Sequence, residues 1–279
     1  MKNILDEVKE IKSIGITGHV SPDGDCIGSC MALYYYLKDE LQNTVEIDIY
    51  LESVPSEFAF LEDSNIIRTH NEYKKTYDIF FALDSGDLKR IGFAKEYFMN
   101  AKKRINIDHH ISNTNYGDIN HVITNASSTC EVLYDLFRED KITGKIATPL
   151  YLGIIHDTGI LTYENTSEKT LNIVGKLISK GIPFTRIVNE TYRQKTFLQN
   201  QLLARCLLDS NLYLNKQCII SYVTRKTMSF YGAKSTDLGG IVNQLGLTKG
   251  VEVAILIHQL GDKDYKVSMR SNNLVNVQK

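Results

Sequence analysis

Four short segments of the sequence place aspartate and histidine directly after apolar runs. Carboxylate and imidazole groups can hold divalent metals, and they can also transfer protons. The segments are GHVSPDGD at 18–25 after the run IGIT, DSGD at 84–87 after IFFAL, DHH at 108–110 after RINI, and HDTG at 156–159 after YLGII. Taken together and in this order, they favour one metal centre over a set of unrelated polar turns.

The first segment carries the strongest signal. It holds three potential ligands, His19, Asp23 and Asp25, within seven residues, and proline and glycine interrupt the run. A compact loop of this kind can direct its two carboxylates towards different ions. Each of the other segments has an ordinary interpretation when taken alone. DSGD can be a turn after a strand, HDTG can be a helix end, and an adjacent histidine pair is weak evidence by itself.

The positions of the segments on the expected fold explain why they should act together. In open parallel sheets, ligands bind beyond the carboxyl ends of the strands. The first three segments occupy that place on three predicted strands, and clustered carboxylates without a counter-charge would repel one another and take up protons. Divalent metals would neutralise them. The candidate ligands are His19, Asp23, Asp25, Asp84, His109 and Asp157.

The chemistry of this ligand set indicates which metals fit. Carboxylates mixed with imidazoles suit manganese or magnesium, and iron or cobalt less well. The motifs contain no thiolate, and the neighbouring Cys26 is the one reservation. Four aspartates balance two divalent ions with a hydroxide between them. Two metals about 3.5–4 Å apart would lower the pKa of that water and stabilise its in-line attack on phosphorus.

The first half of the chain predicts an α/β fold. Apolar, β-branched runs predict strands at 13–17, 45–51, 78–83 and 104–107, and helical periodicity predicts helices at 26–41, 127–139, 146–157 and 167–180. Strands that alternate with helices indicate a mostly parallel sheet with helices on both faces.

The pattern of predicted helices and strands changes after this region. Residues 184–208 read as a polar helical connector, followed by a hairpin at 212–223, a helix at 237–245 and two strands at 251–258 and 265–270. We therefore expect a catalytic domain at 1–185, a helical linker at 186–210 and a smaller α+β domain at 211–279.

Composition excludes several classes of protein. The 279 residues carry a formal net charge of −1, whereas proteins that track a long polyanion usually have a basic excess, so long duplex DNA is not an expected partner. No apolar stretch approaches a membrane span, and the charged amino-terminal residues do not form a secretory signal. The five cysteines form no CxxC pair. We expect a cytoplasmic protein with no membrane association.

With these motifs in view, the chain resembles the DHH phosphoesterase superfamily. The similarity rests on DHH itself, on HVSPDGD, ALDSGD and HDTG, and on the stretches ASSTCEVLYDLF and DTGILTYENTSEKTL. The second region, through VNQLGLTKGVEVAILIHQ and VSMRSNN, is similar to the DHH-associated domain. Within the superfamily, the chain most resembles the bacterial bifunctional oligoribonucleases and 3′-phosphoadenosine 5′-phosphate phosphatases.

The resemblance implies a role for each ligand. One metal would be held by His19, Asp23 and Asp84. The second would be held by Asp25, Asp84, His109 and Asp157, with Asp84 shared between the two ions. The resemblance further implies that His110 faces the scissile phosphate, as a charge stabiliser or proton donor. Asp108 is a natural partner for the histidines.

The resemblance also implies substrate-binding residues in the second domain: Ser268, Arg270 and Ser271. Arginine suits that task because its planar fork can bind a phosphate with two hydrogen bonds, although Arg270 could also be a simple surface charge. A cleft closed by Arg270 would favour short substrates. The family continues past this segment into a glycine-rich motif ending in histidine, so a chain ending at Lys279 reads as truncated.

The function that the resemblance implies is hydrolysis of short RNA oligonucleotides to mononucleotides, together with removal of phosphate from 3′-phosphoadenosine 5′-phosphate. Two divalent ions would be required, most suitably Mn²⁺, with Mg²⁺ or Co²⁺ as alternatives, and a homodimer is possible. Other superfamily activities remain open: linear or cyclic dinucleotide phosphodiesterase, family II inorganic pyrophosphatase and exopolyphosphatase. Short length and neutral charge argue against a RecJ-type DNA exonuclease. The intact ligand set argues against a non-enzymatic nucleotide-binding regulator.

Overall fold

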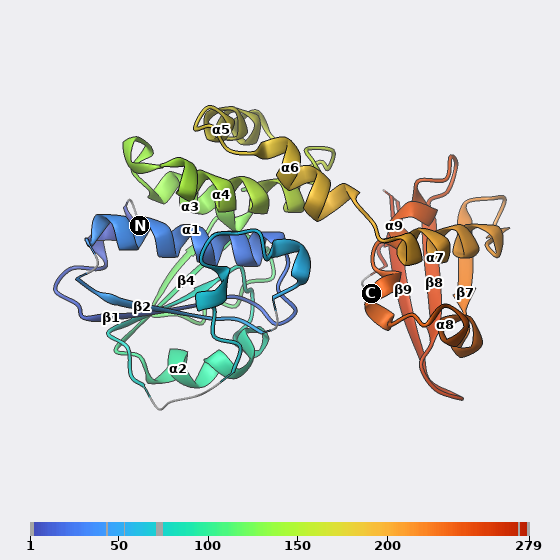
Figure 1. Ribbon diagram of the computed structural model, residues 1–279, viewed down its shortest axis with the longest axis horizontal. Helices are drawn as coiled ribbons and strands as arrows, with labels where there is room; N and C mark the ends of the chain where they lie inside the picture. The colour runs from blue at the N-terminus through green and yellow to red at the C-terminus, as the bar shows by residue number, and fades with distance from the viewer. Residues whose placement is uncertain (1–2, 43, 53, 71–74, 273, 278–279) are drawn as a thin grey trace. The chain divides into compact units, whose positions relative to one another are not determined.

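The computed structural model describes residues 3–42, 44–52, 54–70, 75–272 and 274–277 (Figure 1). The chain divides into two compact units, Met1–Arg193 and Gln194–Lys279. Residues 186–193 of the expected linker thus belong to the first unit and 194–210 to the second.

The first unit is built on a parallel sheet of five strands: β1 (Ser13–Thr17), β2 (Glu46–Tyr50), β3 (Ile79–Leu83), β4 (Lys103–Asp108) and β5 (Ile119–Val122). Their order is β2-β1-β3-β4-β5, and every neighbouring pair is parallel. The chain runs from β1 to β2 on one side and returns to β3 on the other. The direction of winding therefore reverses between β1 and β3, which is where ligands bind in such sheets.

Helices cover both faces of this sheet (Figure 1). On one face lie α1 (Gly24–Glu40), α3 (Thr129–Leu136), α4 (Gly144–Asp157) and α5 (Glu168–Ile178). Helix α1 is so nearly enclosed that every residue from Gly24 to Leu37 is buried, since it lies between the sheet and α4. The other face is covered by η4 (Leu88–Ala94) and α2 (Lys95–Asn100), over a separate cluster that includes Tyr77, Phe80 and Phe98.

These observations confirm the predicted α/β fold. Among the strands and α-helices of the first unit, β5, whose residues are all only half-buried, and the short helix α2 were not predicted; in the second unit, helix α8 was not predicted either. The prediction of one continuous helix at 184–208 was wrong. The structure has α6 (Phe184–Val188), a π-helical turn η6 (Asn189–Arg193) and then α7 (Phe197–Leu208). Thr196 and Gln199 form a capping box that begins α7 afresh.

The second unit is a mixed four-stranded sheet with helices. Its strands are β6 (Asn211–Tyr213), β7 (Cys218–Val223), β8 (Val253–Gln259) and β9 (Tyr265–Ser271), in that order across the sheet. Strands β6 and β7 form the predicted hairpin, whereas β7 and β8 are parallel. The crossover between them contains α8 (Arg225–Tyr231), η7 (Ser235–Leu238) and α9 (Ile241–Gly246).

One face of this second sheet is covered and the other is open. Helices α7 and α9 pack against it, over a core that includes Leu202, Leu245 and Leu256. Residues that alternate with this core point the other way, and Tyr222, Val267 and Met269 among them stay exposed. Edge strand β9 has no buried residue.

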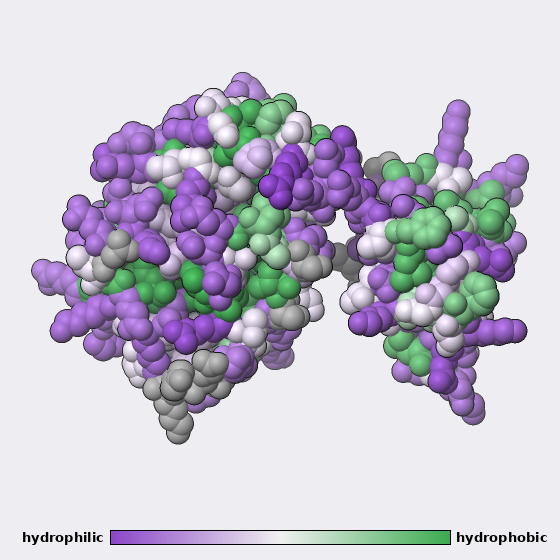
Figure 2. Space-filling model, in the orientation of Figure 1, coloured by the Kyte–Doolittle hydropathy of each residue, from purple (hydrophilic) through white to green (hydrophobic). Residues whose placement is uncertain are grey.

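The short 3-10 helices of the first unit are η1 (Ile4–Asp6), η2 (Ser56–Phe58), η3 (Ser64–Ile66) and η5 (Glu139–Lys141). Within the described ranges, every helix is too short or too polar to cross a bilayer. The visible surface of the first unit is mostly hydrophilic (Figure 2).

Candidate metal centre

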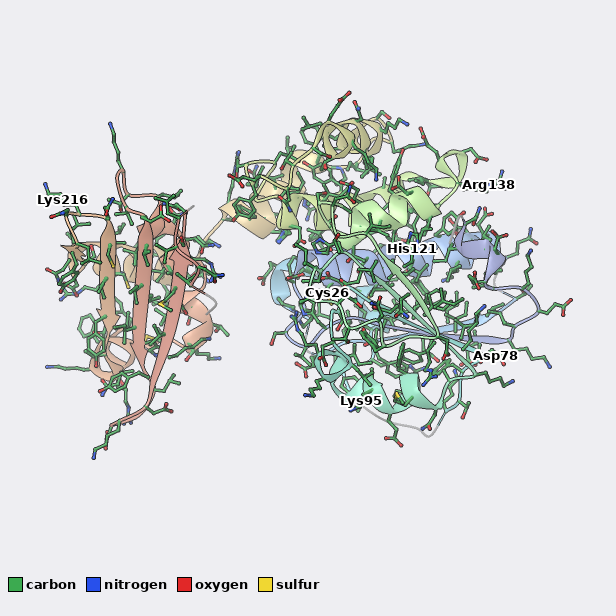
Figure 3. All side chains as sticks on the ribbon, turned by 180° about the vertical axis from the view of Figure 1, so that it is seen from behind. Cys26, Asp78, Lys95, His121, Arg138 and Lys216 are labelled. Atoms are coloured by element: carbon green, nitrogen blue, oxygen red, sulfur yellow. The ribbon has the colours of Figure 1, made fainter. Side chains whose placement is uncertain are left out.

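The predicted ligands gather at the carboxyl ends of three adjacent strands. His19 follows β1, Asp84 follows β3 and Asp108 is the last residue of β4. Figure 3 labels Cys26 at this end of the sheet and Asp78 at the opposite end. Asp84 adopts a φ of 52°, in the left-handed region that aspartate tolerates better than most residues, and its amide donates to the carbonyl oxygen of Ile107 at 3.1 Å. The turn thus directs the Asp84 carboxylate back over the sheet.

The start of α1 supplies the two carboxylates of the first segment. Asp23 caps this helix, because its Oδ1 accepts hydrogen bonds from the amides of Asp25 and Cys26, both at 3.1 Å. Between them, Gly24 lies against the ring of His156: a Cβ there would come within 2.3 Å of His156 Cγ. Any side chain at position 24 would displace the loop that presents Asp23 and Asp25.

The Asp25 carboxylate is buried and held by the beginning of α3. The amide of Thr129 donates to its Oδ2 at 2.6 Å, and the amide of Cys130 donates to its Oδ1 at 3.0 Å. The Thr129 hydroxyl also donates to Asp84 Oδ1 at 3.1 Å. Thr129 therefore orients two candidate ligands at once. The sequence analysis did not single it out, although it lies in the ASSTCEVLYDLF stretch.

Two histidines face the carboxylates from opposite sides of Asp84. His19 Nε2 lies 3.4 Å from Asp84 Oδ2 and 3.5 Å from Asp23 Oδ2. His109 Nε2 lies 3.6 Å from Asp84 Oδ1 and 3.0 Å from Asp157 Oδ2. The two histidines thus connect Asp84 to Asp23 on one side and to Asp157 on the other.

Backbone carbonyls set the orientation of both rings. His19 Nδ1 is 2.8 Å from the carbonyl oxygen of Val20, and His109 Nδ1 is 3.4 Å from that of Ala126. A carbonyl oxygen can only accept, so each Nδ1 carries the proton. Each Nε2 therefore faces the carboxylates, and loss of its proton would leave the lone pair that a metal-binding histidine uses.

The pKa values of these side chains indicate that the cluster of carboxylates needs positive charge to balance it. The pKa of Asp25 is well above its usual range because the group is buried and faces Asp84 and Asp157. Burial also raises the pKa of Asp157. Burial alone would lower the pKa of His19, but hydrogen bonding to Asp23 and Asp84 raises it to about 12. Asp25 and Asp157 are thus driven to hold protons where a divalent cation could replace them.

The spacing of the side-chain donor atoms also fits a divalent metal. His109 Nε2 is buried, and its 3.0 Å contact with Asp157 Oδ2 is too poorly aligned to satisfy it as a full hydrogen bond. Three groups of side chains have ligand atoms that all lie within 4.8 Å of one another: Asp25, His109 and Asp157; Asp84, His109 and His110; and His19, Cys26 and Asp84. Asp23 is outside these groups but contacts His19. Cys26 is a buried thiol near the His19 carbonyl oxygen.

His110 and Asp108 form a distinct pair beside this cluster. His110 Nδ1 donates to Asp108 Oδ1 at 2.7 Å, while Asn113 Nδ2 donates to Asp108 Oδ2 at 2.5 Å. Hydrogen bonding to the fully buried Asp108 raises the pKa of His110. The imidazole of His110, which is partly exposed, therefore favours its charged form.

The three predicted substrate-binding residues of the second unit do not share one face of β9. Ser268 and Arg270 pair with Leu256 and Ala254 of β8 and lie on the same side. Ser271 points to the other side, where its hydroxyl donates to Glu252 Oε1 at 2.8 Å. Arg270 is exposed and donates from Nη1 to the carbonyl oxygen of Met269.

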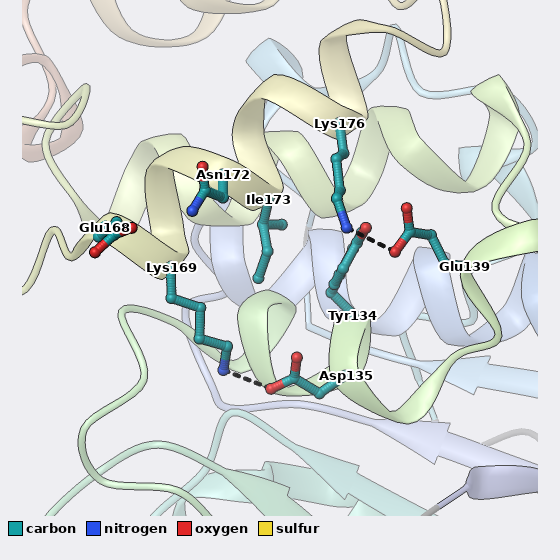
Figure 4. Close-up of a pocket in the computed structure, with 8 residues that line it drawn as sticks. All are labelled: Tyr134, Asp135, Glu139, Glu168, Lys169, Asn172, Ile173 and Lys176. Carbon is teal, nitrogen blue, oxygen red and sulfur yellow. Dashed lines mark hydrogen bonds and ion pairs between the residues drawn. The ribbon is translucent and has the colours of Figure 1, made fainter.

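A separate hollow of about 450 Å³ lies on the outside of the first unit between α3 and α5 (Figure 4). Its lysines are already paired, Lys169 with Asp135 and Lys176 with Glu139. None of the candidate metal ligands lines it. The hollow is a salt-bridged groove between two helices, apart from the chemistry at the strand ends.

Known proteins are similar to this chain over nearly its whole length. A Streptococcus mutans protein named probable bifunctional oligoribonuclease and PAP phosphatase NrnA is 26% identical over 280 residues, covering 98% of this chain and 86% of the relative. A Bacillus subtilis protein named bifunctional oligoribonuclease and PAP phosphatase NrnA is 28% identical over 266 residues, covering 92% of this chain and 80% of the relative. The crystal structure of an exopolyphosphatase-related protein from Bacteroides fragilis matches 95% of this chain and 81% of its own with a TM-score of 0.87 at 24% identity, and so shares the fold.

The family model for the N-terminal domain of the DHH family matches residues 13–154, just over half of the chain. The chain therefore belongs to the DHH family, as its motifs predicted. As a member of that family it is a metal-dependent phosphoesterase.

Proposed function

We propose that the protein hydrolyses short RNA oligonucleotides to mononucleotides and removes phosphate from 3′-phosphoadenosine 5′-phosphate. The names of its curated relatives support both activities. The observation that carries the proposal is the convergence of three other aspartates and two histidines around Asp84. Both reactions present a phosphate group to the same cluster, so one site can serve both.

We assign His19, Asp23 and Asp84 to one divalent ion, and Asp25, Asp84, His109 and Asp157 to a second. Manganese is the metal of choice because the donors are carboxylate oxygens and imidazole nitrogens. When bound, such ions lower the pKa of water and balance the charge of the phosphoryl oxygens. Asp84 serves both assignments because its two oxygens face different histidines, Oδ2 towards His19 and Oδ1 towards His109.

His110 is the residue we assign to the substrate phosphate. Its Nδ1–H is engaged by Asp108, so its Nε2–H is the donor available to a phosphoryl oxygen. The Asp108 carboxylate keeps the ring charged and fixes its direction, while Asn113 fixes the carboxylate in turn. A held imidazolium can stabilise negative charge on the phosphate and can donate a proton to the leaving oxygen. In the second unit, Arg270 and Ser268 are proposed phosphate contacts.

Substrate assays with manganese test this proposal directly. Purified protein should release mononucleotides from RNA dimers to pentamers and phosphate from 3′-phosphoadenosine 5′-phosphate. Release of phosphate from pyrophosphate or polyphosphate alone would replace the proposal with one of those activities. Failure on all of these substrates would refute it.

Asp84→Ala tests the shared ligand. The variant should lose at least about a thousandfold in kcat with every metal tried, because both ions lose an oxygen ligand. Asp87→Asn is the matched control: it lies in the same turn, caps η4 through the Lys89 amide, and asparagine caps equally well. If Asp84→Ala kept substantial turnover while Asp87→Asn behaved normally, Asp84 would not be shared between two ions.

A further inference from the structure

Three aromatic rings, His156, Tyr163 and Tyr192, form a connected group that the proposed reaction does not use; we call it the aromatic edge. His156 and Tyr192 pack edge to face with ring centroids 5.8 Å apart. The hydroxyls of Tyr192 and Tyr163 are 3.5 Å apart. His156 Nε2 donates to the hydroxyl of Thr191 at 2.8 Å, since that hydroxyl itself donates to the carbonyl oxygen of Ile187.

The aromatic edge adjoins the candidate metal centre at both of its ends. The ring of His156 lies against Gly24, between Asp23 and Asp25, where a Cβ would come within 2.3 Å of it. At the other end, the ring of Tyr163 lies against Gly159, where a Cβ would come within 2.4 Å. Gly159 is two residues beyond Asp157. The edge therefore spans the border of the site from its α1 side to its α4 side.

Unusual backbone holds the edge in place. Gly159, Ile160 and Leu161 have φ values of 53°, 57° and 62°, three successive residues in the left-handed region. A β-branched residue such as Ile160 adopts this conformation rarely, at a cost of about 1–3 kcal/mol. The second support, η6, is a π-helical turn and carries both Thr191 and Tyr192. Such turns are rare and occur frequently at functional sites.

Hydrogen bonds tie the left-handed turn to the site. Asn165 Nδ2 donates to the carbonyl oxygens of Ser127 and Asp157 at 3.0 and 3.1 Å. The Thr158 hydroxyl accepts from the Leu161 amide at 3.1 Å. The turn brings Tyr163 back over Gly159, yet Tyr163 keeps 49% of its surface exposed. The ring is held against Gly159, two residues beyond Asp157, while part of it faces solvent.

We infer that the aromatic edge binds the nucleobase of the nucleotide whose phosphate is hydrolysed, with Tyr163 as the stacking surface and Tyr192 beside it. The inference rests on the proposed function and specifies its substrate as a nucleotide. Base-to-aromatic stacking tolerates any base, because every base has a π-face. The site would thus prefer substrates that carry a base over other phosphate esters, without preferring one base.

Paired substrates test this base site. Tyr163→Leu and Tyr192→Leu should each lower kcat/KM for 3′-phosphoadenosine 5′-phosphate by about fivefold to 100-fold. On a control substrate that has the same ribose and two phosphates but no base, kcat/KM of both variants should stay within about twofold of the wild-type value. Tyr163→Phe should keep most of the wild-type kcat/KM for 3′-phosphoadenosine 5′-phosphate, since it keeps the ring. Phe184→Leu is the control, an exposed aromatic of the same unit packed on Tyr151. An equal loss on both substrates, or no loss on either, would overturn the base site.

A binding measurement separates this inference from the proposed function. The chain contains no tryptophan, so Tyr163→Trp introduces a single indole whose fluorescence reports stacking. AMP should quench it in metal-free buffer, and ribose 5-phosphate should not. Equal quenching by both ligands, or none by AMP, refutes the base site even if hydrolysis occurs. If wild-type protein hydrolyses no nucleotide but AMP quenches selectively, the proposed function fails and the base site stands.

Discussion

The carboxyl end of the first sheet and strand β9 of the second sheet hold their polar residues in opposite ways. Around Asp84 the side chains of His19, Asp25 and Asp108 are buried, and their partners come from other segments, as with Asp25 at the start of α3. On β9, Arg270 is exposed on an edge strand, and its guanidinium donates to the carbonyl oxygen of its neighbour in sequence.

The difference shows what each task demands. Metal ligands must converge within a few ångströms, so their positions are held by a supporting layer of hydrogen bonds and close packing. A side chain that meets a flexible phosphate substrate can be long and exposed, because the substrate itself completes the geometry. We therefore expect substitutions around the first sheet to act through neighbouring residues, and substitutions on β9 to act one residue at a time.

Glu131→Gln should have the largest effect on folding. Its buried carboxylate accepts from the hydroxyls of Ser127 and Thr170, both at 2.7 Å, and pairs with Lys169 at 3.3 Å. An amide removes the charge and one acceptor, so urea denaturation should show a loss of about 3 kcal/mol in the free energy of unfolding. Glu139→Gln is the control, since Glu139 pairs with Lys176 on the surface, where solvent screens the pair, and the substitution should leave the free energy of unfolding nearly unchanged. Equal losses would contradict the supporting role of Glu131.

Gly153→Ala should disturb the candidate metal centre by pushing against Asp25 and Cys130. A Cβ there would lie 2.3 Å from Cys130 Sγ and 2.5 Å from Asp25 Oδ1. Overpacking of this kind costs about 2 kcal/mol and should also weaken metal binding by shifting Asp25. The matched change Gly175→Ala, in α5 with no atom within 4 Å, should stabilise the protein by about 0.5 kcal/mol. Unchanged metal affinity in Gly153→Ala, measured by calorimetry, would show that Asp25 is not held in this way.

Metal affinity should rise with pH. In the metal-free protein, hydrogen bonding and charge from nearby carboxylates raise the pKa of His19 to about 12 and of His109 to about 10, against the opposing effect of burial. Both imidazoles therefore hold an extra proton at neutral pH, and a metal must displace it. Each proton released makes the affinity rise by about tenfold per pH unit. Calorimetry in buffers of different ionisation enthalpy measures the release, and an affinity independent of pH between 6 and 8 would contradict it.

Arg270→Ala should have the smallest effect and a purely local one. Loss of one phosphate contact should raise KM about fivefold, with metal affinity and melting temperature unchanged. Arg225→Ala, an exposed arginine of the same unit paired with Asp262, should leave KM unchanged. A rise in KM for both variants would indicate a general electrostatic effect, and no rise for either would remove Arg270 from the substrate site.

The sequence alone was sufficient to predict four of the five strands of the first sheet and the grouping of the ligand segments. Strand β1 was predicted at its observed bounds, 13–17, because β-branched apolar runs report burial on both faces of a parallel sheet. Once the strands are parallel, their carboxyl ends share one edge, and Asp84, His19 and Asp108 must lie near one another. Nothing beyond local periodicity was needed for that step.

Only the tertiary structure revealed what supports the ligands. Asp25 and Thr129 are 104 residues apart in the chain, and no local pattern relates the carboxylate to that amide. The left-handed turn at Ile160 opposes the residue's own preference, so propensity predicts against it. The break after η6 was hidden by a helical periodicity that continued across it. Local sequence preferences determined where the strands of this phosphoesterase end, and so which residues can serve as ligands. Packing between distant segments decided how those side chains are held and placed Tyr163 beside them.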